Sequence, residues 1–292
     1  MRRRYGAITQ ATTMDCQQHP TCESRVYLNV DMLEPEVFEL AGGSVAVLWA
    51  RKPEKSTPNE DAAAVVATGD SSAVLIVADG CGGMANGEQA ARIAIDSLTN
   101  HLSAAAASGE SLRTAILDGV EQANRQIIEL KNGAGATLAV VQIENGEARP
   151  YHIGDAQIVM VGGRGKVKLL TTSHSPVGYA LEAGMLGEQE AIDHEERHLV
   201  SNYLGSEAMH VEMGSVRKLS SRDGLLVASD GVLDNLLLDE ITSLLKSGTA
   251  AAAATKIAGL AMQRMLSALD GQPHKPDDLT LIVFSQRGKR AK

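Results

Sequence analysis

Acidic residues stand at the ends of apolar, strand-like runs at five distant places in this sequence. They are Glu60 with Asp61, Asp79, Asp155, Asp230 and Asp277. A carboxylate at the tip of a buried strand is costly to remove from water unless a cation or several hydrogen-bond donors compensate it. If folding brings the five places together, mutual repulsion would raise their pKa values sharply unless divalent metal neutralises them.

The ligand types in this set favour a particular class of metal. Oxygen ligands without His or Cys select hard ions, so the pattern indicates Mg²⁺ or Mn²⁺ rather than zinc. Glycine adjoins three of the aspartates, for example Gly80 after Asp79. Because glycine lets the backbone approach closely, the Gly80 carbonyl can join the ligand set.

Three other interpretations of these motifs are weaker. A single Asp-Gly pair is more often a hairpin turn than a metal ligand, and only the whole set favours a metal site. The glycine-rich residues 80–83 lack the G-x-G-x-x-G spacing, and Asp79 would stand where a dinucleotide pyrophosphate must approach. The sequence also has no G-x-x-x-x-G-K-[ST] phosphate loop.

The elements that must position these carboxylates form blocks of strands and blocks of helices. Apolar runs predict strands at residues 44–50, 62–67, 73–78, 137–143, 148–153, 157–161, 166–170, 211–216, 224–228 and 279–284. One-sided apolar patterns predict helices at residues 86–101, 112–130 and 247–269. This order predicts an α+β fold in one domain.

Two segments fall outside this pattern. Residues 1–42 have no sustained period, so we interpret them as an N-terminal extension or an added edge to the main domain, residues 43–292. Residues 174–196 are polar and acidic, which is typical of an exposed excursion rather than of core.

Composition excludes several classes of protein. The 27 basic and 36 acidic residues give a net charge of −9, which repels nucleic acid, and the 3% aromatic content argues against base stacking. Cysteines 16, 22 and 81 form neither a disulfide framework nor a CxxC pattern, which favours a reducing compartment. No run approaches the roughly 20 apolar residues of a membrane span. We therefore expect a cytoplasmic protein without membrane or nucleic-acid partners.

In these motifs the sequence resembles the metal-dependent serine/threonine protein phosphatases of type 2C, in their compact bacterial form. The matching segments, in order, are residues 59–61, 77–83, 135–137, 152–155, 170–175, 203–205, 228–231 and 277–280. Each is short, but together they are specific. The resemblance implies a four-layer α-β-β-α sandwich, in which helix pairs flank two antiparallel sheets, with a binuclear metal centre at one end of the sheets.

The resemblance also implies a role for each acidic position. Asp79 would bridge two metal ions, with Asp230 and Asp277 completing the first. The remaining implied ligands are Asp61, Glu60 and the Gly80 carbonyl for the second ion, and Asp155 with Asp230 for a third, looser ion. Residues 174–196 would be a flap that shapes substrate entry. A metal-bridged water would then attack the phosphorus of phosphoserine or phosphothreonine directly.

The sequence departs from the family pattern around the phosphate. Ser56 occupies the position of the usual phosphate-binding Arg, and the nearest arginine is Arg51, which we take as the candidate substrate ligand. Ala136 and Ala156 replace residues that usually carry hydroxyls. His152 is interpreted as structural or solvent-facing rather than catalytic.

Two functions remain open from the sequence. The first is a Mg²⁺- or Mn²⁺-dependent phosphatase that dephosphorylates proteins and opposes a serine/threonine kinase. The second is a phosphatase-fold binding or regulatory module with little turnover. A phosphatase of the sporulation and stress-regulator branch shares the closing Asp277-Asp278 style, but it lacks the full glycine-rich second motif present here.

Overall fold

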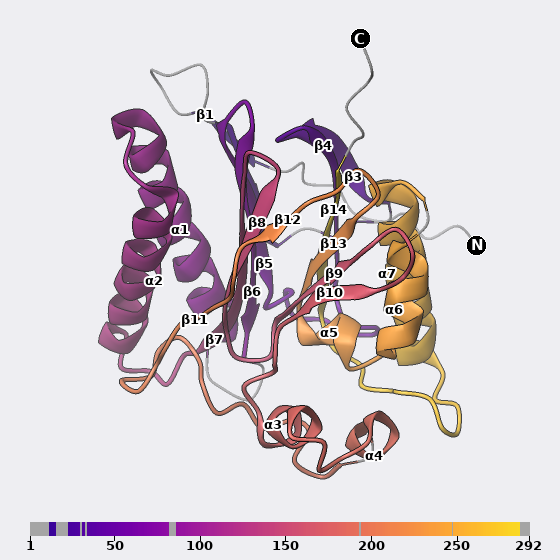
Figure 1. Ribbon diagram of the computed structural model, residues 1–292. Coiled ribbons are helices and arrows are strands. Elements are labelled where there is room, and N and C mark those ends of the chain that lie inside the picture. Colours follow the sequence, from indigo (N-terminus) through magenta and orange to yellow (C-terminus); the bar gives the residue numbers. More distant parts are fainter. Residues whose placement is uncertain are drawn as a thin grey trace, which may run out of the picture.

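The molecule is built of four layers (Figure 1). The computed structural model describes residues 12–15, 23–29, 31–32, 34–81, 86–192, 194–246 and 248–286. Helices α1 and α2 cover one sheet, a second sheet packs on its other face, and α6 and α7 cover the second sheet. This arrangement confirms the predicted α+β, four-layer α-β-β-α sandwich.

The first sheet has eight strands among the described residues, in the order β1-β2-β5-β6-β7-β8-β11, with β12 also pairing with β8. Their bounds are β1 Thr12–Asp15, β2 Glu23–Tyr27, β5 Ala62–Gly69, β6 Ser72–Gly80, β7 Ala136–Glu144, β8 Glu147–Ile153, β11 Glu212–Met213 and β12 Arg217–Lys218. All of these pairings are antiparallel.

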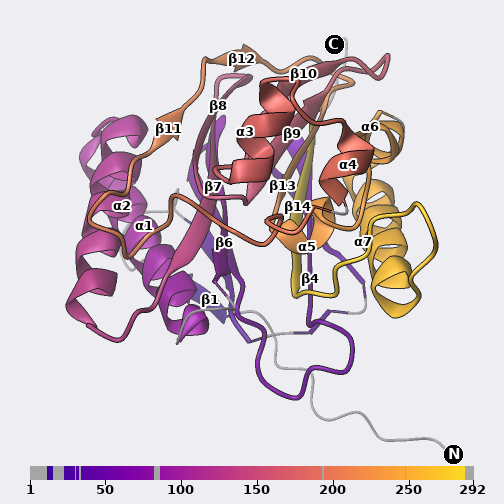
Figure 2. The ribbon, with the colours of Figure 1, turned by 90° about the horizontal axis from the view of Figure 1, so that it is seen from below.

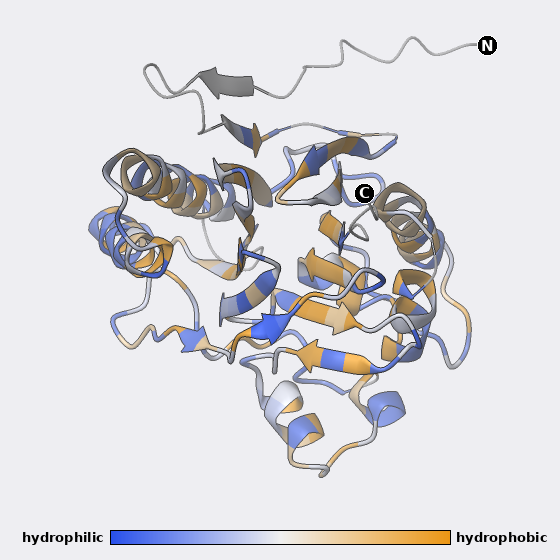
Figure 3. Cartoon of the chain, turned by 45° about the horizontal axis from the view of Figure 1, so that its top comes forward, coloured by the Kyte–Doolittle hydropathy of each residue, from blue (hydrophilic) through white to orange (hydrophobic). Residues whose placement is uncertain are grey.

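The second sheet has six strands among the described residues, in the order β10-β9-β13-β14-β4-β3, again antiparallel throughout. Their bounds are β3 Glu36–Leu40, β4 Gly43–Ala50, β9 Gln157–Val161, β10 Val167–Leu170, β13 Gly224–Ala228 and β14 Leu279–Gln286. Most residues of β4, β9, β13 and β14 are buried, which suits strands covered on both faces. Figure 3 shows the distribution of hydrophobic and hydrophilic residues over the chain.

The helices have the following bounds: α1 Gly87–Ser108, α2 Leu112–Glu129, α3 Pro176–Glu182, α4 Glu188–Ile192, α5 Asp230–Leu233, α6 Leu238–Leu245 and α7 Ala250–Leu266. The short helices α3 and α4 lie together at one end of the sandwich, as the view from below shows (Figure 2). None of the helices formed by the described residues has the length and hydropathy to cross a membrane.

Side-chain alternation along the strands divides the interior into separate cores. In β6, Val74 and Ile76 pack against α1 and α2, whereas Leu75 and Val77 pack between the two sheets. All four are fully buried, and each contributes about 1.5–3 kcal/mol of burial free energy. Because both faces of β6 are buried, its register is fixed and the residues at its end have defined directions.

Most of the predicted long elements are present in the structure. The helix predicted at residues 86–101 extends to Ser108, and the one predicted at 247–269 is limited to Ala250–Leu266. The strand predicted at 211–216 is wrong in extent, because two short strands, β11 and β12, flank residues 214–216. Helices α5 and α6 were not predicted, since four and eight residues are too short for a clear helical period.

Described parts of residues 1–42 join both sheets. Strand β2 pairs with β5, and β3 pairs with β4 at the edge of the second sheet. Residues 1–11, 16–22 and 82–85, among others, lie outside the described residues.

Candidate metal centre

Asp61 and Asp79 lie at one end of the core between the two sheets. The odd-numbered residues of β5 and β6, such as Val65 and Val77, face this core. Because side chains alternate along a strand, Asp61 and Asp79 continue the same face beyond the last apolar residue. Ser229, which follows β13 of the opposite sheet, donates a hydrogen bond of 2.8 Å from its hydroxyl to Asp61 Oδ2. The polar end of the inter-sheet core is therefore built from both sheets.

Three further aspartates reach the same end from loops and a helix start. Asp155 lies between β8 and β9, Asp230 begins α5, and Asp277 stands just before β14. The backbone N–H of Asp230 donates to Asp79 Oδ2 at 3.5 Å. Burial, together with the charges of these three aspartates and Asp61, raises the pKa of Asp79 well above its usual value. The structure thus brings together the five aspartates that the sequence analysis singled out.

The same crowding affects the other carboxyls of the cluster. Burial and the charge of Asp230 raise the pKa of Asp61 to about 8, that of Asp155 to about 7 and that of Asp277 to about 6. Carboxyls with raised pKa values at neutral pH bind either protons or cations. The donors are oxygens, which hard divalent cations prefer, so the residues present fit the Mg²⁺ or Mn²⁺ ions that the sequence implies.

Gly80 is held where no larger residue fits. A Cβ atom on Gly80 would lie 2.4 Å from the carbonyl carbon of Gly87 and 2.6 Å from the carbonyl oxygen of Glu60. The start of α1 therefore packs directly on the end of β6. The Gly80 carbonyl as a metal ligand stays a prediction.

Cys81, the next residue, is a protonated thiol. Burial, with the charges of Asp155 and Asp230, raises the pKa of Cys81 to about 12. A protonated thiol is a poor nucleophile.

Two lysines, Lys55 and Lys275, form ion pairs with acidic residues at the cluster, and neither was predicted from the sequence. Lys55 Nζ lies 2.8 Å from Glu60 Oε2 and 2.5 Å from Asp278 Oδ2. On another side, the ammonium of Lys275 contacts Asp230 and also Asp234. Burial alone would lower the pKa of Lys55, but its hydrogen bonds to the two carboxylates raise it, so Lys55 stays charged.

Asp278 and Glu60 organise the loop before β5. Asp278, 3% exposed, accepts hydrogen bonds from the backbone N–H groups of Lys52 and Glu60 at 2.8 and 2.7 Å. The carboxylate of Glu60 is turned to Lys55. Of the acidic pair that opens β5, Asp61 thus joins the aspartate cluster, while Glu60 makes an ion pair at its edge.

Arg51, the predicted phosphate ligand, forms an ion pair with Asp31. Its Nε lies 2.5 Å from Asp31 Oδ2, and its backbone N–H donates to Asp31 Oδ1 at 2.9 Å. Both side chains are about two-fifths exposed. Phosphate binding by Arg51 stays a prediction, and Lys55 is a second basic residue at the edge of the cluster.

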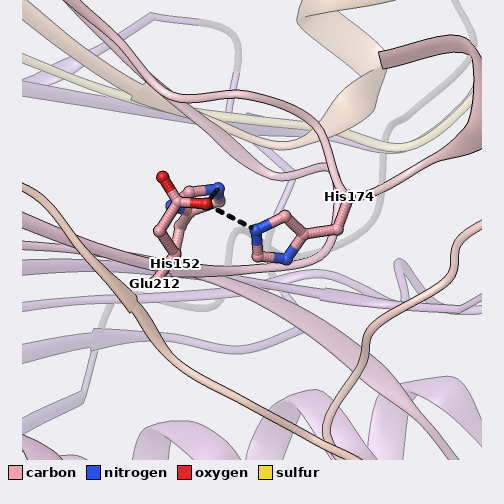
Figure 4. Close-up of side chains that lie close together, drawn as sticks. All are labelled: His152, His174 and Glu212. Carbon is pink, nitrogen blue, oxygen red and sulfur yellow. Dashed lines mark hydrogen bonds and ion pairs between the residues drawn. The ribbon is translucent and has the colours of Figure 1, made fainter. Parts of the chain in front are cut away.

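A second group with metal-ligand side chains comprises His152, His174 and Glu212, whose ligand atoms lie within 4.8 Å of one another (Figure 4). His174 Nδ1 accepts hydrogen bonds from the Gly154 N–H at 3.1 Å and from the Asn202 amide at 2.8 Å. A neutral imidazole that accepts at Nδ1 carries its proton on Nε2, which here donates to Glu212 at 3.1 Å.

This hydrogen-bond pattern makes the histidine group structural. The Asn202 amide cannot be turned around, because it also donates to the carbonyl of His210 and accepts from its N–H. A metal at His174 Nε2 would have to displace the only ring proton. His152 and His174 are 2% and 1% exposed. His174 is hydrogen-bonded to the Gly154 backbone beside Asp155, and His152 to the Thr172 carbonyl.

A pocket of about 550 Å³ begins at the acidic cluster. Asp155, Asp230 and Asp234 line one end, and its walls come from α3, α4 and the α5–α6 region. These walls are mostly apolar, with Leu181 and Leu238 among them. The segment at 174–196 therefore covers a space that leads to the carboxylates.

Comparison with known proteins agrees with this geometry. Residues 51–272 match the family described as "Protein phosphatase 2C". Protein phosphatase PhpP of Streptococcus pneumoniae is 29% identical over 201 residues, which cover 66% of this chain and 81% of PhpP.

Solved structures share the fold. The S. agalactiae serine/threonine phosphatase has a TM-score of 0.68 and 26% identity, over 82% of this chain and 98% of its own. The catalytic domain of serine threonine protein phosphatase PstP, solved in complex with two manganese ions, has a TM-score of 0.62 and 22% identity, over 84% and 98%. Since the family match spans most of the chain and the fold agrees with it, the chain belongs to the protein phosphatase 2C family.

Proposed function

We propose that this chain hydrolyses phosphoserine and phosphothreonine in proteins with the help of Mg²⁺ or Mn²⁺ ions. The observation that carries the proposal is the convergence of Asp61, Asp79, Asp155, Asp230 and Asp277 at one end of the inter-sheet core. Burial and the repulsion from the other four aspartates raise the pKa of Asp79. A protein does not keep such a cluster for stability alone, because every member would prefer to be paired or exposed.

The ligand assignment follows from the positions of the carboxylates. Asp79 stands among the other aspartates and is proposed to contact two ions; Asp230 and Asp277 would hold one of them, and Asp61 with the Gly80 carbonyl the other. Bound divalent ions lower the pKa of a coordinated water and neutralise charge on phosphoryl oxygens. The presence of two manganese ions in PstP, which has the same fold, supports this choice.

The chain's own residues orient the site and the substrate. Ser229 and the rigid end of β6 fix the directions of Asp61 and Asp79. Lys55, at the edge of the cluster, is placed to attract a phosphate dianion, and Arg51 is the other proposed contact. A positive charge beside a reacting phosphate stabilises the charge of the transition state.

The substrate class follows from the site and the family. The pocket under α3 and α4 is open to the cluster at its acidic end, so the polypeptide around a phosphorylated side chain can lie against apolar walls. We propose a phosphoprotein substrate in the cytoplasm, phosphorylated by a serine/threonine kinase that this chain opposes.

The proposal is tested by phosphate release from phosphoserine, phosphothreonine and phosphotyrosine peptides, with Mn²⁺ and with EDTA. The wild type should hydrolyse the phosphoserine and phosphothreonine peptides with Mn²⁺ but not with EDTA, and it should not hydrolyse the phosphotyrosine peptide. Asp79→Asn and Asp230→Asn should lose at least about a hundredfold in kcat, as expected when a charged group at a reaction centre is removed. Asp118→Asn, at an exposed position of α2, is the surface control. A folded wild type that hydrolyses no phosphopeptide with any divalent metal would support a binding module instead.

A further inference from the structure

Lys275, in the loop between α7 and β14, holds its ammonium group between two carboxylates at the outer side of the acidic cluster. Its Nζ lies 2.5 Å from Asp230 Oδ2 and 2.6 Å from Asp234 Oδ2. The Lys275 side chain is 21% exposed. A lysine ammonium held between two carboxylates is a cation at neutral pH.

The backbone of Lys275 is clamped by a buried asparagine. Asn235, which is fully buried, accepts from the Lys275 N–H at 2.8 Å through Oδ1 and donates to the Lys275 carbonyl at 2.7 Å through Nδ2. The carbonyl of Asn235 in turn accepts from the buried Arg264 at 2.8 Å. Because Asn235 directly follows Asp234, the clamp fixes both the lysine and one of its carboxylate partners. The position of the ammonium group is therefore set by the fold.

Asp155 belongs to the same side of the cluster. It lines one pocket wall together with Asp230 and Asp234, and the charge of Lys275 also acts on its carboxyl. The family resemblance implies that Asp155 and Asp230 hold a third metal ion. An ion at those carboxylates would stand within a few ångströms of the ammonium group, and like charges at such separations repel strongly inside a protein.

We propose that the ammonium group of Lys275 is a resident cation in place of a third metal ion, so that the chain binds two divalent ions and no third. The inference rests on the proposed function, because it concerns the same metal centre. An ammonium on a flexible four-carbon stem presents three donors, and here two of them are used by Asp230 and Asp234. Lys275 is thus a positioning residue that orients Asp230.

The test is a titration of the protein with Mn²⁺ that measures the number of ions bound per chain. Isothermal titration calorimetry and the electron paramagnetic resonance signal of free Mn²⁺ both report this number. Wild type should bind two ions. Lys275→Met keeps the apolar stem but removes the charge, so it should bind a third ion. Adding Asp155→Asn to that variant should return the number to two. Lys275→Arg keeps the charge and should bind two, as should Lys256→Met at an exposed position of α7.

Three results of this titration would overturn the proposal that Lys275 takes the place of a third ion. Three ions bound by the wild type would overturn it without any variant, even if phosphatase activity is normal. A folded Lys275→Met protein that still binds two ions would also overturn it and leave Lys275 as a structural ion pair. A wild type that binds no Mn²⁺ and hydrolyses no phosphopeptide would overturn the proposed function, and this inference with it.

Discussion

Ser229 and Asp61 are 168 positions apart in the sequence, yet the Ser229 hydroxyl donates a 2.8 Å hydrogen bond to the Asp61 carboxylate. Ser229 follows a strand of one sheet and Asp61 precedes a strand of the other. The same Ser229 oxygen accepts from the Thr280 N–H at 3.0 Å. One buried hydroxyl therefore joins the two sheets at the end where the aspartates gather.

Ser229→Ala should lower the free energy of unfolding by about 1–3 kcal/mol, because it leaves a buried acceptor and a buried N–H donor without their partner. Urea denaturation in EDTA measures the change without metal binding. Ser243→Ala, at an exposed position of α6, should leave the value unchanged. Equal stabilities of the Ser229 variant and the wild type would show that this bond does not hold the sheets together.

Gly80→Ala should destabilise the fold by about 1–3 kcal/mol, the usual range for overpacking. The added Cβ would press on backbone atoms of Gly87 and Glu60, which cannot rotate away. Thermal unfolding measures the effect. The matched control is Gly259→Ala in α7, where a Cβ meets nothing within 4 Å and should stabilise the helix by about 0.5–1 kcal/mol. A Gly80 variant as stable as the control would contradict the close approach of α1 to β6.

The long buried elements and the acidic cluster could be predicted from the sequence, whereas its basic partners could not. The apolar run before Asp79 predicts a buried strand, and an aspartate at the end of that strand indicates a bound cation. Lys275 gives no such signal, because its partner Asp230 is 45 positions away, and Lys55 contacts Asp278 across 223 positions. These lysines look like ordinary solvated residues in a polar loop. Only the tertiary fold shows that each sits between two carboxylates.

The metal-free protein should lose stability as the pH rises from about 4 to about 8. In the unfolded chain the aspartates ionise near pH 4, whereas the folded protein keeps Asp277, Asp155 and Asp61 protonated up to about pH 6, 7 and 8. The folded state therefore binds more protons in this window, and its extra stability is complete below pH 4 and is lost as these groups ionise.

Urea denaturation in EDTA at a series of pH values measures this loss. Asp155→Asn should make the decline shallower, because one of the titrating carboxyls is gone. A stability that rises with pH, or a slope that Asp155→Asn leaves unchanged, would contradict the crowding of the aspartates.

Lys55→Met should reduce kcat/KM for a phosphopeptide by about 10- to 100-fold, the range expected when a charged contact to phosphate is lost. Arg51→Met should have the smaller effect, because Lys55 contacts Glu60 and Asp278, the sequence neighbours of Asp61 and Asp277, whereas Arg51 pairs with Asp31. Steady-state kinetics of both variants, with thermal unfolding to verify the fold, compare the two residues. The opposite ranking would assign the phosphate contact to Arg51, as the sequence predicted.

Folding gathers the five aspartates at one end of the inter-sheet core, where we propose that they hold divalent cations. Anomalous diffraction at the manganese edge, from crystals grown with Mn²⁺, tests it most directly. We expect strong anomalous peaks within bonding distance of Asp79, Asp230 and Asp277, and no peak between Asp155 and the Lys275 ammonium. Crystals saturated with Mn²⁺ that show no peak beside Asp79 would contradict it.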